Sequence, residues 1–190
     1  MHLKKNILSG VGLVVAIVAF ASAQMSSNGM RGMDDDMAPL DDARIAHIAV
    51  TADNIDIAYA HLALAFSANP EVRRFAETMI SDHGAVNAKA AALAQKLGLA
   101  PLDNEVSQQL IDQASAKMDE ISQKRGANFD RAYAANELAY HQAVNAAVRD
   151  TLIPNTKNPE LKKLLESAVP IFLAHEEHAR RLNKAVNGGS

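Results

Sequence analysis

The chain has 190 residues, no Cys, no Trp and a formal net charge of −3. This length suits one domain with a sizeable core. The slight acidity disfavours nucleic acid as a partner, because binding it depends on clustered Lys and Arg that neutralise phosphates. Absence of Cys excludes disulfides and thiol-linked lipids. Aromatic residues make up only 4% and Ala is abundant, which favours packed helices over a β-sandwich or barrel.

Residues 1–23 have the pattern of a secretory signal peptide. Lys4 and Lys5 precede an apolar run over residues 7–20, and Ala21-Ser22-Ala23 offers a small-residue cleavage site. The apolar run of about 14 residues is shorter than the ~20 that span a bilayer, so an uncleaved anchor is the less favoured alternative. We expect export to the periplasm or secretion, with no integral membrane span after cleavage.

Residues 24–41 are polar, contain Gly and lack periodicity, which predicts a flexible leader. This leader carries four Met and three consecutive Asp. Thioethers select Cu(I), so a weak copper-collecting arm is one interpretation, and an acidic linker with incidental Met is the other. Residues 42–187 form the predicted helical domain, and residues 188–190 a disordered tail.

The first two helices are predicted over residues 42–68 and 70–97. Asn69-Pro70 ends the first helix and starts the second, because Asn69 suits the N-cap position and Pro70 the first helical position. Gly98 suits the C-terminal end of the second helix. A connection this short predicts antiparallel packing of the two helices.

Three further helices are predicted, over about residues 104–124, 128–152 and 159–186. The first of them reads as a crossover or cover, Asn128 is expected to cap the next, and Pro170 to kink the last. The last has a regular seam, expected to contain Leu161, Leu164, Ala168, Ile171, His175, His178, Leu182 and Ala185. The sequence therefore predicts an all-α fold: a ferritin-like antiparallel four-helix bundle with an additional crossover helix.

Polar residues occupy or adjoin the apolar seams of all four bundle helices. They are Asp56, Asp82, His83, Glu137, His141, His175 and His178. A buried polar group left unsatisfied costs about 1–3 kcal/mol, so these residues should be paired or ligating. Asp56 and His83 are about equally far from the turn at Asn69-Pro70, which places them at one level of the bundle.

A carboxylate and imidazole cluster contributed by four helices predicts a metal site within the bundle. Imidazole suits Zn, Cu, Fe or Ni, and carboxylate adds Mn, so one transition metal ion of unspecified identity is the predicted cofactor. The alternative is that these side chains hydrogen-bond one another and fix helix register without a metal.

Several short motifs resemble a family of exported bacterial proteins, domain of unknown function 4142. The motifs are Asn69-Pro70-Glu71-Val72 with Phe75, Met79-Ile80-Ser81-Asp82-His83, Phe129-Asp130-Arg131-Ala132-Tyr133 with His141, and Pro170 with His175. The resemblance covers about residues 44–187. It implies a ferritin-like bundle, and members are often labelled predicted outer membrane proteins. Because every long segment here has helical period, we expect at most peripheral association with the outer membrane.

The resemblance also implies site residues. Asp56 matches the acidic residue of the family's first helix, Asp82 and His83 match its Asp-His pair, and His141 and His175 match its later histidines.

Two departures from the family pattern concern the carboxylates. Asp56 is one methylene shorter than the usual Glu, and Glu137 stands where an amide is expected. The Glu-x-x-His spacing of di-iron centres is missing at His83, His141 and His175, which disfavours ferroxidase activity.

The leading functional hypothesis is an envelope protein that binds or buffers a transition metal through this buried site. The alternative is a metal-free structural or stress-related envelope protein that acts through protein partners. An oxidase or peroxide-handling enzyme would need an open coordination position on a redox metal. No catalytic residue is predicted.

Overall fold

The computed structural model describes residues 39–188, and within that range the chain is helical with no strand. The five long helices are α2 (Asp42–Phe66), α3 (Pro70–Leu97), α4 (Glu105–Ser122), α5 (Ala127–Ala147) and α7 (Pro159–Gly188). The predicted all-α class is confirmed. The predicted signal peptide, the predicted leader up to residue 38 and the last two residues lie outside the described range. None of the described helices combines the length and apolarity needed to cross a membrane.

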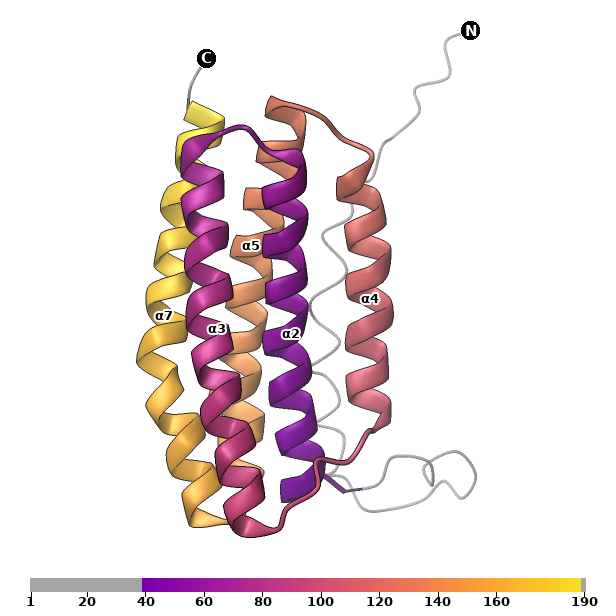
Figure 1. The fold of residues 1–190 in the computed structure, drawn as a ribbon, viewed down its shortest axis with the longest axis vertical. Helices are drawn as coiled ribbons and strands as arrows, with labels where there is room; N and C mark the ends of the chain where they lie inside the picture. The colour runs from indigo at the N-terminus through magenta and orange to yellow at the C-terminus, as the bar shows by residue number, and fades with distance from the viewer. Residues whose placement is uncertain (1–38, 189–190) are drawn as a thin grey trace, which may run out of the picture.

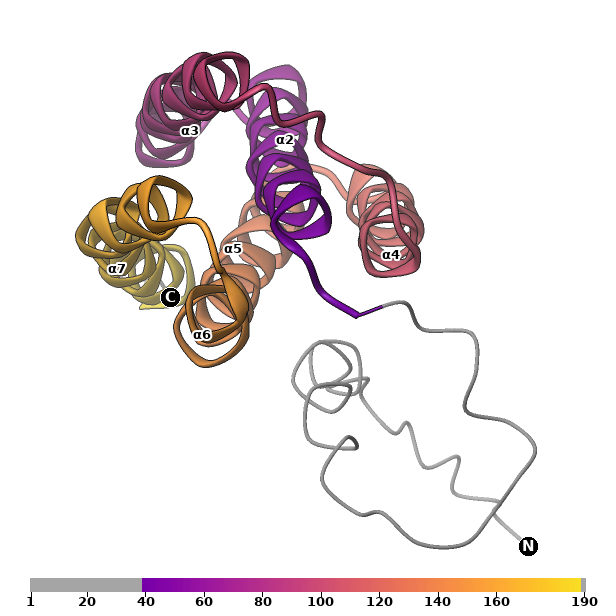
Figure 2. The same ribbon diagram turned by 90° about the horizontal axis from the view of Figure 1, so that it is seen from below.

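Four of the helices lie side by side along the long axis, and α4 lies outside them (Figure 1). α2 packs against α3 and α5, and α7 packs against α5 and α3. Figure 2 shows α4 beside α2, on the side away from α3 and α7. Each neighbouring pair among the four is antiparallel, because α4 carries the chain from the lower end of α3 to the upper end of α5.

The ends of α3 follow from its sequence. The backbone N–H of Glu71 donates to Asn69 Oδ1 at 2.9 Å, and Pro70 occupies the first turn. Gly98 ends the helix with φ of 60°, a left-handed conformation that costs glycine little. The predicted boundaries of this helix are confirmed.

The start of α5 differs from the prediction. Gly126, with φ of 56°, precedes the first helical residue, Ala127. Asn128 lies inside the first turn, where its side chain accepts from Arg131 at 2.7 Å instead of capping the helix. The predicted Asn128 cap is therefore wrong.

The C-terminal end of α5 continues into a π-helical turn, η2 (Val148–Leu152), and a short helix, α6 (Ile153–Asn155). The backbone N–H of Ile153 bonds to the carbonyl of Val148, five residues back. Pro154 has no N–H and its ring would crowd the carbonyl four residues before it in an α-helix. The wider turn just before Pro154 fits that constraint.

The buried stripe of α7 keeps four of the eight predicted positions, and at three others the buried residue is the next one along the chain. Buried are Leu161, Leu165, Ala168, Phe172, His175, Ala179 and Leu182. Leu164, Ile171 and His178 are only half-buried and Ala185 is exposed, so their predicted place on the seam is wrong. Helix α7 runs through Pro170 without interruption.

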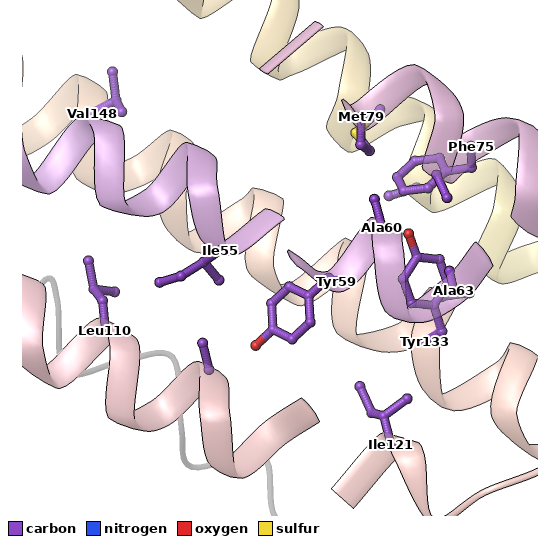
Figure 3. Packing of buried hydrophobic residues seen from close by; sticks show 14 of the residues in the cluster. Ile55, Tyr59, Ala60, Ala63, Phe75, Met79, Leu110, Ile121, Tyr133 and Val148 are labelled. Carbon is purple, nitrogen blue, oxygen red and sulfur yellow. The ribbon is translucent and has the colours of Figure 1, made fainter. Parts of the chain in front are cut away.

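The apolar core joins α4 to the four inner helices. Figure 3 shows Leu110 and Ile121 of α4 facing the side of α2 that carries Ile55 and Tyr59. Farther along, the rings of Phe75 and Tyr133 meet edge to face at 6.2 Å. All six side chains are buried. The core therefore holds α2, α3 and α5 in place around the buried polar residues.

Candidate metal centre

Three buried imidazoles from three different helices meet inside the molecule. They belong to His83 on α3, His141 on α5 and His175 on α7, and each side chain is at most 5% exposed. One nitrogen from each ring lies within 4.8 Å of the corresponding nitrogens of the other two. Three nitrogen donors at this separation could hold one cation between them, with metal–nitrogen bonds of about 2.0–2.1 Å after small adjustments.

One nitrogen of each imidazole is held by an oxygen on the outer side of the cluster. His83 Nδ1 lies 2.7 Å from Asp53 Oδ1 and His175 Nε2 lies 2.9 Å from Asp82 Oδ2. His141 Nδ1 lies 2.9 Å from the backbone carbonyl oxygen of Glu137. Such contacts fix the tautomer and direction of metal-binding imidazoles.

The other nitrogen of each ring is buried without a hydrogen-bond partner among the described residues. These atoms are His83 Nε2, His141 Nε2 and His175 Nδ1. Leaving several buried polar atoms unpaired in one place is unfavourable, and such atoms in a native structure call for an explanation such as an ion or water. The three unpaired nitrogens are the donor atoms that a cation would use.

Asp56 on α2 supplies a carboxylate to the same cluster from the fourth inner helix. Its Oδ2 lies 2.6 Å from His83 Nε2 and 3.3 Å from His141 Nε2. Although these atoms are close, none of them has a well-aligned hydrogen-bond partner within residues 39–188. Short approaches without hydrogen-bond alignment are the arrangement expected of several ligands directed at one point.

Glu137 belongs to a second group of donor atoms, which shares His141 with the group of three imidazoles. Donor atoms of Asp56, Glu137 and His141 also fall within 4.8 Å of one another. Glu137 is completely buried, and neither of its carboxylate oxygens has a hydrogen-bond partner in the described chain, although Oε2 lies 3.8 Å from His141 Nδ1. Burial, followed by the negative charge of Asp56, raises the pKa of Glu137 well above its usual value.

The electrostatics of the cluster centre on His83. Burial alone would lower its pKa, but the contacts with Asp53 and Asp56 raise the pKa of His83 to about 10. Burial opposes ionisation of Asp56, yet the neighbouring His141 and His83 lower its pKa below the usual range. One proton on His83 therefore balances part of the carboxylate charge, and a metal ion would displace that proton.

Two predicted site residues lie at the edge of the cluster. Asp82 contacts His175 from a side chain that is 42% exposed, and it belongs to neither donor group. His178 is half-buried, packs edge to face on Phe75 at 4.9 Å and also joins neither group. Sequence reasoning missed Asp53, whose spacing of three residues before Asp56 on one helix face was the available signal.

Fold and site together define a helical protein with a buried cluster of imidazoles and carboxylates that could hold a metal ion. The family model described as a domain of unknown function, DUF4142, matches residues 28–182. The chain belongs to this family. Comparisons with curated proteins and with solved structures gave no match.

Proposed function

We propose that this protein binds one divalent first-row transition metal ion inside the helical bundle and serves to bind or buffer that metal outside the cytoplasm. The proposed ligands are His83, His141, His175 and Asp56, with Glu137 beside them. The observation that carries the proposal is the set of three buried imidazoles, each with one nitrogen held by an oxygen and the other without a hydrogen bond. Two of these second nitrogens, on His83 and His141, lie beside the Asp56 carboxylate.

The donor set favours certain metals. Three imidazoles and one carboxylate suit Zn, Cu, Ni or Fe, and affinity for a given site generally rises from Mn and Fe through Ni to Cu, with Zn below Cu. Because His83, His141 and His175 are almost fully buried, the site resembles a closed holding site more than an open catalytic one. Asp53 and Asp82 are proposed to orient the ligands.

A metal-free structural role is the second candidate, and one observation favours it. The Asp53–His83 and Asp82–His175 contacts tie α3 to α2 and to α7 without any ion. In that case the histidines would fix the positions of the helices, and replacing them would change stability while added metal would have no effect. The protein would then act through partners at its surface.

Metal content separates the two candidates. The chain, produced with its own N-terminal segment and collected from the periplasm, should retain a stoichiometric transition metal measured by elemental analysis. His83→Ala should lose most of this metal because one of the proposed donor nitrogens is removed. His61→Ala, at an exposed histidine of α2, is the matched control and should retain it.

A clear negative result would reject metal binding. If the wild-type protein retains no metal and shows no thermal shift with Zn, Cu, Ni, Fe or Mn, the metal-free structural role replaces it.

Export and the finer fold are parts of the same proposal. We infer cleavage after Ala23, which intact-mass measurement of periplasmic protein would check by an N-terminus at Gln24. We also infer that the four inner helices form a ferritin-like bundle with α4 as the crossover, since α3 and α5 run in the same direction and α4 returns the chain between them. Periplasmic protein that keeps residues 1–23 would contradict the first inference.

A further inference from the structure

A separate apolar cavity of about 330 Å³ lies between the helices, on the side of the cluster toward the N-terminal end of α2. Its walls come from α2, α3, α4, α5 with η2, and α7. Several wall side chains, among them Ile48, Leu152 and Leu165, are buried in the interior of the molecule. The cavity is nevertheless partly open, because Asn54, Ala91 and Pro101 among its lining residues are exposed. A slender molecule could enter it from this side.

Small side chains account for the cavity. Facing helices contribute Ala46, Ala94, Ala147 and Ala168 to its walls. Helix α3 has no buried residue after His83, although Val86, Leu93 and Leu97 continue its apolar stripe and line the cavity. These apolar side chains stay partly exposed to water unless something occupies the cavity, and that exposure is unfavourable.

The polar side chains of the cavity gather at one end. Only Asp53, Asn54 and Asn87 among the lining residues are polar. Asn87 Nδ2 donates to Asn54 Oδ1 at 2.9 Å, whereas Asn87 Oδ1 is buried with no partner in the described chain. Asp53 is already engaged by His83. The cavity is therefore hydrocarbon along most of its length, and an unpaired amide oxygen lies buried beside its polar end.

We propose that this cavity binds one single-chain amphiphile: an unbranched alkyl chain with an uncharged hydroxyl head placed at Asn87. The volume is roughly twice that of a 150 Å³ core cavity that holds benzene, which corresponds to about a dozen carbon atoms. Ten residues separate Asn87 from Leu97 along α3, a rise of about 15 Å that suits an extended chain. The carboxylate of Asp53 beside the polar end disfavours an anionic head.

Saturable uptake of 1-dodecanol by the purified chain tests the proposal, measured by equilibrium dialysis of the radiolabelled alcohol. One molecule per chain should bind. Ala168→Leu and Ala94→Leu fill the cavity from α7 and α3 and should each weaken binding at least tenfold. Ala92→Leu, at an exposed position of α3 outside the cavity, should bind as the wild type does. Absence of saturable uptake, or unchanged uptake in both cavity variants, would overturn the proposal.

The head group is tested separately. Dodecanol should compete better than dodecane for the wild-type protein, and Asn87→Leu should remove that preference. Dodecanoate at pH 8 should bind more weakly than dodecanol, and equal binding would refute the uncharged head. All measurements should give the same result in EDTA, because the cavity walls contain none of the proposed metal ligands. Binding lost in EDTA would contradict an independent site.

Discussion

Asp53, His83 and Asp56 form a continuous line of contacts from α2 to α3 and back to α2. His83 lies between the two carboxylates, at 2.7 Å from Asp53 Oδ1 and 2.6 Å from Asp56 Oδ2. In this position Asp53 fixes the imidazole and raises its basicity, while Asp56 occupies the side where an ion would bind. Asp53 contacts none of the atoms that would bind the ion. Through His83 it can still control how strongly the ion is held.

Asp53→Asn should reduce metal affinity without abolishing it. Asparagine keeps the size of the side chain but loses the charge that makes the His83 nitrogen more basic, and outer contacts of this kind are worth about 10-fold to 100-fold in affinity. Competition with a chelator of known affinity measures the change. Asp112→Asn, at an exposed position of α4, is the control. Equal effects of the two substitutions would assign the loss to general electrostatics.

Glu137 gives a pH signature to the metal-free protein. Its folded-state pKa is raised above the unfolded value because of burial and the charge of Asp56. A group with a raised folded pKa favours folding fully below its unfolded value, near 4.5, and loses that contribution as pH rises toward the folded value. In EDTA, ionisation of Glu137 should therefore lower the free energy of unfolding as the pH rises.

Glu137→Gln should remove this part of the pH dependence, since the amide cannot ionise. The free energy of unfolding is measured by urea denaturation in EDTA. As the pH increases from 5 to 8, the value for the variant should rise relative to the value for the wild type. A difference between the two proteins that stays constant over this range would show that Glu137 is ionised and compensated in the folded state.

At the scale of elements, the limits of sequence prediction show most clearly in α7. The seven-residue spacing of Leu161, Ala168, His175 and Leu182 is confirmed, because these positions are apolar or histidine and all are buried. Between them, Leu164-Leu165 and Ile171-Phe172 offer two adjacent apolar residues each, so hydrophobicity alone does not decide which faces inward. Packing against α3 and α5 decides it, and the sequence of α7 alone contains no such information.

Local chemistry made other features predictable. Pro70 and Gly98 define the ends of α3, since each has a backbone requirement that few other positions meet. The level at which Asp56 meets His83 also followed from the short turn between α2 and α3. Asp53 was missed because its partner is on another helix, and the cavity was missed because it depends on how far helices lie apart.

Leu165→Ala should destabilise the protein more than Leu164→Ala. The first side chain is buried and the second half-buried, so the first should cost about 2–5 kcal/mol and the second about half of that or less. Urea unfolding in EDTA measures both. A larger cost for Leu164→Ala would indicate that the predicted seam, with Leu164 facing inward, is the correct one.

At the scale of the whole molecule, a metal that binds only the folded chain should raise its thermal stability. At free metal concentrations 100 times the dissociation constant, the gain is about 2.7 kcal/mol. For a domain of this size each kcal/mol shifts Tm by roughly 2–4 °C, so the rise should be roughly 5–11 °C. Calorimetry at several metal concentrations measures it, with His83→Ala as the control. A Tm independent of metal concentration would contradict binding to the folded state.

The partial exposure of Asp82 bears on the speed of exchange as well as on its equilibrium. Every other carboxylate in contact with the three imidazoles is closed off from solvent, whereas the Asp82 side chain reaches the surface between α3 and α7. Parting of the Asp82–His175 pair would shorten the route by which a hydrated ion arrives or leaves. The rate of ion uptake and release would then be set by the brief separation of α3 and α7. An ion bound with high affinity could still exchange quickly by this route.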